Sequence, residues 1–198
     1  MPLHGSETRE FIAQSGENIR TFVLRSDDGG ENWQYWATVA HDAANILQLA
    51  EPGMARLHSG RLVCLIRATA RPGRSDNMWM VYSDDDGASW SRPLRTVLWG
   101  FPADVMQLQD GPVLAVYGHR RDPFGVRGCL SDDGITWLRE NEFIIKEGGA
   151  APSSFRQYWH TGYPTVTQCD DGTIVTAYHE YTNDAQPIQC MWVTRFTP

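Results

Sequence analysis

Several charged and aromatic residues stand at the ends of otherwise apolar, strand-like runs, where their side chains could meet a ligand. In "EPGMARLHSGRLVCLIR", Glu51 opens the run and Arg67 ends it, sixteen residues later. Arg127 follows in "PFGVRGCLSDDG", and Tyr163 opens "YPTVTQCDDGTIVTAYH". A planar guanidinium binds a carboxylate through paired hydrogen bonds, and several such groups together could hold an acidic ligand. These residue types therefore indicate a binding site for an acidic molecule.

Other polar residues compete for the same roles. Arg120 and Arg121 in "GHRRDPFGVRG" are alternatives to Arg127, and His119 and His160 lie near the same expected face. Each candidate also has a plain structural interpretation. The glutamate could be a solvated strand end, the arginines could pair with acidic residues, the tyrosine could be a packing aromatic, and a lone histidine is usually an ordinary loop residue.

An acidic segment that ends in tryptophan occurs three times. It indicates which secondary-structure elements carry the candidate residues. The copies are "SDDGGENW" from Ser26, "SDDDGASW" from Ser83 and "SDDGITW" from Ser131. Serine and aspartate side chains bond nearby backbone N–H groups, glycine adopts positive φ, and tryptophan packs between strands. We therefore expect three hairpin turns of one kind. The third copy is one residue shorter, so its turn should differ in detail.

A second repeat runs in phase with the first. Gly60, Gly111 and Gly172 each follow Ser or Asp and separate two β-rich runs, as in hairpin turns. One four-stranded antiparallel sheet every 50 to 60 residues is typical of a β-propeller blade. We expect an all-β, single-domain propeller or propeller fragment over 1–198. Its approximate blades are 1–45, 46–98, 99–147 and 158–198.

Composition narrows the possible partners. The chain has 198 residues, 41% of them hydrophobic, and a net charge of −7 without a basic stripe, which disfavours nucleic acid. No apolar run is long enough for a membrane span, and no signal peptide is visible. The four cysteines form no C-x-x-C pair and EF-hand spacing is missing, so neither a metal nor a cofactor is expected. The sequence as written suits the cytoplasm, or secretion if a leader-bearing N-terminus is missing.

The acidic segments resemble S-x-D-x-G-x-[ST]-W, the Asp-box or bacterial neuraminidase repeat, and the chain resembles the sialidase superfamily of six-bladed propellers. The resemblance implies a retaining glycosidase that cleaves terminal sialic acid or a related acidic sugar. Tyr163 would be the nucleophile, activated by Glu51, and Arg67 and Arg127 would hold the substrate carboxylate. Arg120, His119 and His160 are further candidates for substrate binding. Because Asp-boxes also occur in other propellers, a non-catalytic propeller that binds glycan or protein is the alternative.

Two elements of the sialidase pattern have no match in this sequence. The family's first arginine and its acid aspartate belong to earlier blades, and 1–25 contain no aspartate. The sequence also supplies only about two thirds of a six-bladed propeller at this period. Because open blade edges recruit partners, we expect a homo-oligomer or a completing partner chain.

Overall fold

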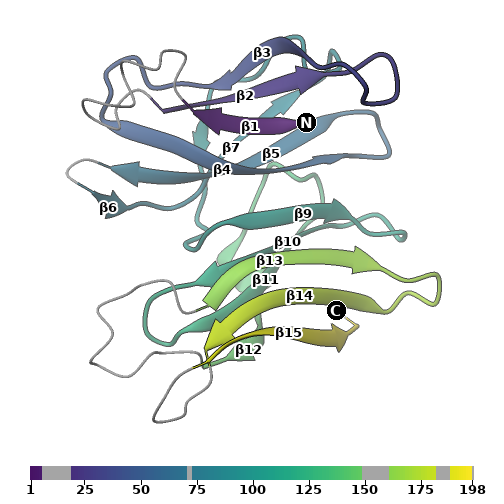
Figure 1. Ribbon diagram of the computed structural model, residues 1–198. Coiled ribbons are helices and arrows are strands. Elements are labelled where there is room, and N and C mark those ends of the chain that lie inside the picture. Colours follow the sequence, from purple (N-terminus) through teal and green to yellow (C-terminus); the bar gives the residue numbers. More distant parts are fainter. Residues whose placement is uncertain (6–18, 71–72, 149–160, 182–187, 198) are drawn as a thin grey trace. The chain divides into compact units, whose positions relative to one another are not determined.

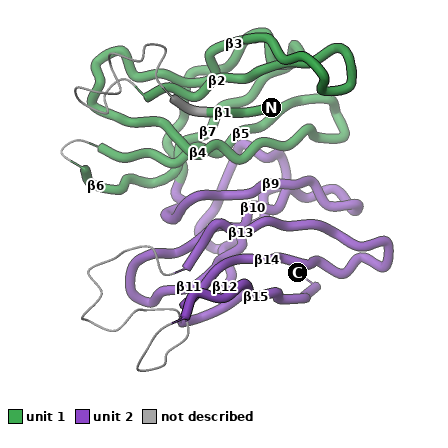
Figure 2. Tube along the Cα trace, in the orientation of Figure 1, with its two compact units in different colours: residues 1–96 green, residues 97–198 purple. Residues whose placement is uncertain are grey.

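The computed structural model describes residues 1–5, 19–70, 73–148, 161–181 and 188–197, and these residues form antiparallel sheets (Figure 1). The expected all-β fold is confirmed. One turn of 3-10 helix, Arg139–Asn141, interrupts the strands of the described residues. In the part of the chain that the structure describes, no helix has the length and hydropathy of a membrane span. The chain divides into two compact units, residues 1–96 and 97–198 (Figure 2).

The first unit holds two sheets. One has the strand order β1-β2-β3, formed by β1 (Pro2–Gly5), β2 (Arg20–Arg25) and β3 (Gln34–Ala40). The other has the order β4-β5-β7-β8, formed by β4 (Leu47–Arg56), β5 (Leu62–Ala70), β7 (Trp79–Ser83) and β8 (Leu94–Arg95), with the short β6 (Arg74–Ser75) paired to β5. Consecutive strands are neighbours, as in a propeller blade.

The second unit repeats this plan. Its four-stranded sheet has the order β12-β11-β10-β9 and consists of β9 (Ala103–Gln107), β10 (Val113–His119), β11 (Gly125–Ser131) and β12 (Glu142–Glu147). Its three-stranded sheet consists of β13 (Thr161–Gln168), β14 (Ile174–Tyr181) and β15 (Gln189–Phe196), in that order. Within the second unit, β13 lies beside β9 and β10 (Figure 1).

Each unit has its own apolar core, centred on a second strand. Leu62–Ile66 of β5 are all buried, as are all seven residues of β10. The first core joins Leu49, Cys64 and Ile66, and the second joins Leu114, Val116 and Ile174. A strand that is buried on both faces has a nearly continuous run of apolar residues in its sequence, so a polar residue within such a run is recognised as unusual.

The three acidic segments form turns stabilised by their own side chains. In the second, the hydroxyl of Ser83 accepts from Gly87 N at 2.9 Å, and Asp85 accepts from Ser89 N at 2.8 Å. The indole N–H of Trp90 donates to the Gly87 carbonyl at 3.1 Å. The first turn repeats this pattern from Ser26 to Trp33.

The third turn differs, as its shorter sequence suggests. The hydroxyl of Ser131 accepts from Gly134 N at 3.0 Å and itself donates to the Thr136 carbonyl at 2.7 Å. The indole N–H of Trp137 is buried and makes no hydrogen bond within the described residues. One deleted residue thus shifts the serine bond from four residues ahead to three and removes the tryptophan bond.

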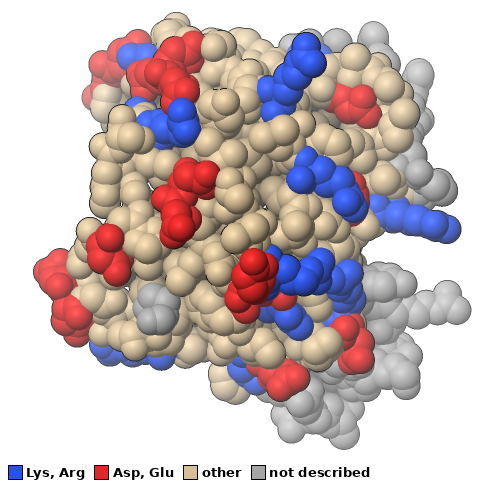
Figure 3. Space-filling view, turned by 180° about the vertical axis from the view of Figure 1, so that it is seen from behind, with Lys and Arg blue, Asp and Glu red and all other residues tan. Residues whose placement is uncertain are grey.

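Charged side chains pair over much of the described surface. On the face drawn in Figure 3, Lys and Arg lie in small groups beside Asp and Glu. In the first unit, the guanidinium of Arg61 lies 2.6 Å from Asp84, and Asp86 pairs with both Arg25 and Arg56. In these pairs a positive side chain lies directly beside a negative one.

Candidate functional site

Glu51 and Arg67 form an ion pair in the first unit. Arg67 Nη1 donates to Glu51 Oε1 at 2.9 Å, and the two side chains are 19% and 17% exposed, arginine first. The residues come from adjacent strands, since Ala50 of β4 lies opposite Arg67 of β5. The pair lies within this hairpin, because β4 and β5 stay paired beyond it as far as Leu47 and Ala70, so the expectation that Glu51 opens its strand is wrong.

The backbone at Glu51 is unusual for a strand. Glu51 has φ of 48°, and the register shifts between Ala50 and Pro52, which marks a β-bulge. A non-glycine residue at positive φ is uncommon, and a residue before proline normally adopts extended conformations. Strain of this kind persists where surrounding structure enforces it, and it is concentrated at functional sites. The bulge aims the Glu51 side chain toward Arg67.

Tyr163 has the same local geometry in the second unit. Its φ is 47°, the register shifts between Gly162 and Thr165, and Pro164 follows. The Tyr163 side chain is 47% exposed, so its ring is accessible to solvent. Glu51 and Tyr163, at equivalent positions in their hairpins, therefore share one backbone conformation.

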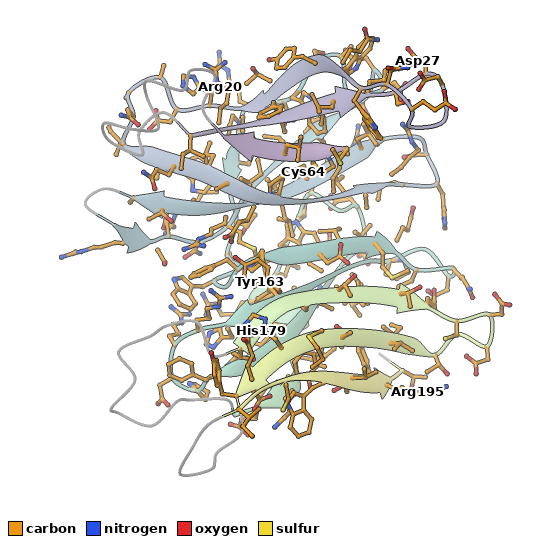
Figure 4. The ribbon with its side chains drawn as sticks, viewed as in Figure 1. Arg20, Asp27, Cys64, Tyr163, His179 and Arg195 are labelled. Carbon is orange, nitrogen blue, oxygen red and sulfur yellow. The ribbon has the colours of Figure 1, made fainter. Side chains whose placement is uncertain are left out.

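Two side chains flank the ring of Tyr163. The imidazole of His179 stacks on it with centroids 5.6 Å apart and planes at 28° (Figure 4). The guanidinium carbon of Arg120 lies 5.3 Å from the ring centroid. Arg120 is only 4% exposed, and its Nε donates to the Thr161 carbonyl at 2.9 Å. A buried positive charge therefore lies beside the tyrosine.

Two glycines permit this arrangement. A Cβ at Gly118 of β10 would meet the Cα of Gly162 at 2.8 Å, and a Cβ at Gly162 would meet Arg120 Nη2 at 2.7 Å. Gly162 also has φ of 142°, which disfavours a side chain. Strands β10 and β13 approach to backbone contact here, and the arginine fills the remaining space.

Arg127 belongs to a separate network on β11 and β12. Its Nη1 donates to Glu142 Oε1 at 2.6 Å, and the hydroxyl of Tyr117 donates to Glu142 Oε2 at 2.6 Å. Burial, followed by the hydrogen bond to Glu142, raises the pKa of Tyr117. Tyr117 therefore stays protonated and can donate to the carboxylate. Sequence analysis did not single out Glu142, because a glutamate in "RENEF" carries no distinguishing signal.

His119 is buried at the end of β10 and makes hydrogen bonds to two neighbouring residues. Its Nδ1 lies 2.8 Å from the Pro123 carbonyl and its Nε2 accepts from Arg121 Nε at 3.2 Å, so Nδ1 carries the proton. Burial lowers the pKa of His119, which favours the neutral ring. Arg121 lies 4.3 Å above the ring of Trp99, and Trp99 packs edge-on against His119.

The candidate residues predicted from the sequence thus lie in separate groups in the structure. Glu51 meets Arg67 in the first unit, while Arg120 meets Tyr163 in the second, and His160 lies outside the described residues. His179 was missed, although a signal existed. In the aligned repeats His179 stands sixteen residues after Tyr163, just as Arg67 stands sixteen after Glu51.

No group of three or more His, Cys, Asp or Glu side chains in the described ranges could hold a metal ion. The chemistry available to the described residues is that of a carboxylate, a phenol, arginines and histidines. Proton transfer, nucleophilic attack and recognition of a charged or hydroxylated ligand are within the reach of this set.

Comparison with known proteins gives a consistent picture. The profile of the family described as BNR repeat-like domain matches residues 2–176. A protein of unknown function from Dyadobacter fermentans is 25% identical, with a TM-score of 0.75 over 92% of this chain and 46% of that chain. An α-L-arabinanase from Penicillium chrysogenum is 16% identical, with a TM-score of 0.66 over 91% of this chain and 55% of that one.

A Hadza microbial sialidase is also similar, with 16% identity and a TM-score of 0.61 over 90% of this chain and 38% of that one. The chain spans between 38% and 55% of the length of these three structures. A search of curated proteins returned no match. The similarities confirm that the chain has the BNR-type glycoside hydrolase fold, built from β-propeller blades of the sialidase type.

Proposed function

The chain belongs to the BNR repeat-like family, and we propose that it is part of a retaining glycosidase that removes a terminal acidic sugar, of the sialic acid class, from a glycan. Tyr163 is the proposed nucleophile and Glu51 its general base, with Arg67, Arg127 and Arg120 as the basic residues that favour an anionic sugar. The chain spans about half the length of these two solved structures, so the activity of a whole enzyme is a proposal for this chain.

One observation carries the proposal: Glu51 and Tyr163 share a strained backbone. Glu51 has φ of 48° and Tyr163 has φ of 47°, and both lie at a bulge directly before proline. Each such conformation costs free energy. Among the described non-glycine residues, Asn45 and Asp86 also have positive φ, but they lie in a bend and a turn and not in a strand. Positive φ within a strand at Glu51 and Tyr163 is expected if the bulges serve to present a carboxylate and a phenol to a ligand.

The surroundings of Tyr163 support its role. A phenol is a weak nucleophile while it is protonated, and a nearby positive charge stabilises the phenolate that develops during attack. The Arg120 guanidinium, 5.3 Å from the ring and nearly inaccessible to solvent, is placed to do this. A neutral phenol also avoids the repulsion that a carboxylate nucleophile would meet beside the carboxylate of a sialoside.

The proposed reaction has two steps. Tyr163 Oη attacks the anomeric carbon as its proton passes to Glu51, and the bond from that carbon to the leaving oxygen breaks. Water then attacks the anomeric carbon of the tyrosyl intermediate, and the bond from that carbon to Tyr163 Oη breaks as Glu51 returns its proton to the phenolate oxygen. The proton lost by the water passes to solvent or to the released leaving group, and the sugar leaves with its configuration retained. An aryl leaving group departs as a phenolate with little need of an acid, so aryl glycosides are the substrates of choice for this chain.

A second candidate is a glycosidase for neutral pentosides. Arg67 pairs with Glu51, and Arg127 pairs with Glu142. A guanidinium already paired with a carboxylate attracts a substrate carboxylate less strongly. An arabinanase among the structural neighbours is in keeping with this alternative.

A panel of aryl glycosides separates these candidates. The purified chain is incubated with the 4-methylumbelliferyl glycosides of sialic acid, α-L-arabinofuranose and β-xylose, and release of the fluorophore is followed. Selective turnover of the sialoside supports the first proposal, and selective turnover of a pentoside replaces it with the second. Saturable binding of a sialoside without hydrolysis, unaffected by Tyr163→Phe, would favour a non-catalytic propeller that binds glycan.

A further inference from the structure

The three acidic turns share one design, yet the first exposes its tryptophan. Trp137 of the third turn is 5% exposed, and Trp90 of the second is partly buried against the first unit's core. Trp33 of the first turn is 47% exposed, although its indole N–H donates to the Gly30 carbonyl as Trp90 donates to Gly87. Trp33 therefore makes the hydrogen bond found in the second turn while its ring remains accessible to solvent.

Trp33 borders two cavities of the first unit. One has a volume of about 370 Å³ and the other about 290 Å³, and Arg25 and Asp27 line both (Figure 4 shows Asp27 at this turn). A second tryptophan, Trp36, 37% exposed, lines the larger cavity. The larger cavity is thus a pocket of the size of one or two sugar rings, with two accessible indoles in its wall.

The polar wall of this pocket is held in place by the protein. Asp86 accepts from Arg25 Nη1 at 3.0 Å and also pairs with Arg56. Arg25 lies 4.6 Å above the ring of Trp36, and the Trp36 indole N–H donates to the Asp86 carbonyl at 3.2 Å. Because these groups are fixed before a ligand arrives, little ordering is needed on binding.

The charged side chains that line the pocket balance. Arg25 and Arg56 supply two positive charges, and Asp27 and Asp86 supply two negative charges. A pocket with paired charges does not select an anion, but its carboxylate and guanidinium groups can accept from and donate to hydroxyls. Flat aromatic rings offer an apolar surface to the C–H face of a sugar. This combination matches a neutral saccharide.

We propose that this pocket, lined by Trp33, Trp36, Arg25, Asp27, Arg56 and Asp86, binds a neutral oligosaccharide as an accessory site. It lies at the end of β4 that carries the Gly60 turn, because Arg56 Nη1 donates to the Gly60 carbonyl at 3.1 Å. Glu51 lies five residues back along this strand, about 17 Å away at 3.3 Å per residue. The site therefore goes beyond the proposed catalytic function and does not depend on it.

The test is a titration of the intact, ¹⁵N-labelled chain followed through its tryptophan indole N–H signals. The probes are xylobiose, arabinobiose and cellobiose, with N-acetylneuraminic acid as the anionic comparison. The signals of Trp33 and Trp36, assigned from Trp33→Phe and Trp36→Phe, are expected to shift with at least one neutral disaccharide. Trp33→Ala should weaken binding about tenfold or more, as the loss of an aromatic anchor does.

Trp192→Ala is the matched control, since Trp192 is 42% exposed in the second unit and should leave binding unchanged. Absence of any Trp33 shift at about 50 mM of each neutral disaccharide, a concentration that would largely fill a site with a Kd of about 1 mM, overturns the proposal. So does a stronger shift with N-acetylneuraminic acid. Sedimentation showing self-association that Trp33→Ala abolishes would assign the surface to a second copy of the chain instead. The wild-type titration decides the question even if Trp33→Ala fails to fold.

Discussion

His179 stacks on Tyr163 at the position that Arg67 occupies beside Glu51. Gly162 lies opposite His179 in the β13–β14 hairpin, as Ala50 lies opposite Arg67 in the β4–β5 hairpin. In each hairpin the residue after that pair is bulged, precedes proline and meets the side chain sixteen residues ahead. The two hairpins are therefore copies of one arrangement, with an ion pair in one and an aromatic stack in the other.

This relationship predicts that His179 positions the phenol. His179→Ala should lower kcat for the aryl glycoside that the chain hydrolyses by up to about tenfold and leave KM unchanged, since an aromatic pair contributes about 1 kcal/mol. His179→Phe, which keeps the stack, should recover most of the activity. His41→Ala, an exposed histidine of the first unit, is the control. Equal losses for Ala and Phe would contradict a positioning role.

The proposed roles of Glu51 and Tyr163 predict non-additive kinetics. Tyr163→Phe should abolish measurable turnover, and Glu51→Gln should lower kcat/KM by about 100-fold, the usual contribution of a general base. The double variant should be no worse than Tyr163→Phe, because residues that act as one unit lose their effect together. A Tyr163→Phe variant that keeps its activity would remove the tyrosine from the mechanism.

Backbone strain predicts a difference between two substitutions of similar size. At Tyr163, asparagine tolerates positive φ while valine does not, and both lose the stack on His179. Tyr163→Val should therefore be less stable to urea than Tyr163→Asn by about 1 kcal/mol. Thr165→Val and Thr165→Asn, two residues along the same strand, give the control comparison. Equal stabilities at Tyr163 would mean that the conformation costs nothing.

The second acidic turn predicts a dependence of stability on pH. Hydrogen bonds from Ser89, first its hydroxyl and then its N–H, lower the pKa of Asp85 to about 2. A carboxyl whose pKa is lower in the folded chain stabilises it above the unfolded pKa, and this contribution is lost as the pH falls through the folded value. The free energy of unfolding should therefore drop between about pH 4 and pH 2.

Asp85→Asn should remove the contribution of this carboxyl to the dependence of the unfolding free energy on pH. Urea denaturation at several pH values measures that dependence. The control is Asp110→Asn, which changes an exposed carboxyl in the β9–β10 turn. Identical slopes for the wild type and Asp85→Asn would show that the hydrogen bonds do not distinguish the folded from the unfolded carboxyl.

Strand β15 predicts self-association, the state expected from the sequence. Within the described residues β15 pairs with β14 alone, and its Met191 and Val193 are 71% and 62% exposed. A strand with one open edge and exposed apolar side chains recruits another strand. Size-exclusion chromatography with light scattering should give a mass above 22.3 kDa, and Val193→Lys should lower it. A monomeric wild-type chain would contradict this expectation.

Much of the fold could be anticipated from the sequence because the repeats are local. A turn such as Ser83–Trp90 is stabilised within its own eight residues, so its composition is visible in one window. The alternation of strands and glycine turns added the order of the sheets. Short strands such as β6 and β8, two residues each, carry no such periodic signal.

Only part of the candidate site could be predicted from the sequence. The Glu51–Arg67 spacing was visible because both residues belong to one hairpin. The partner of Arg127 was not, since Glu142 lies on the next strand and a glutamate at a strand start has many uses. The burial of Arg120 against Thr161 depends on β10 meeting β13, 41 residues apart in sequence, which no local pattern records.

Where Gly118 touches Gly162, no side chain separates the two strands. The distance from β10 to β13, and with it the height of Tyr163 above Arg120, is consequently set by the thickness of two bare backbones. A single methyl group at Gly118 would act as a spacer that shifts the phenol relative to its guanidinium. Turnover could then be altered from a position that never meets the sugar.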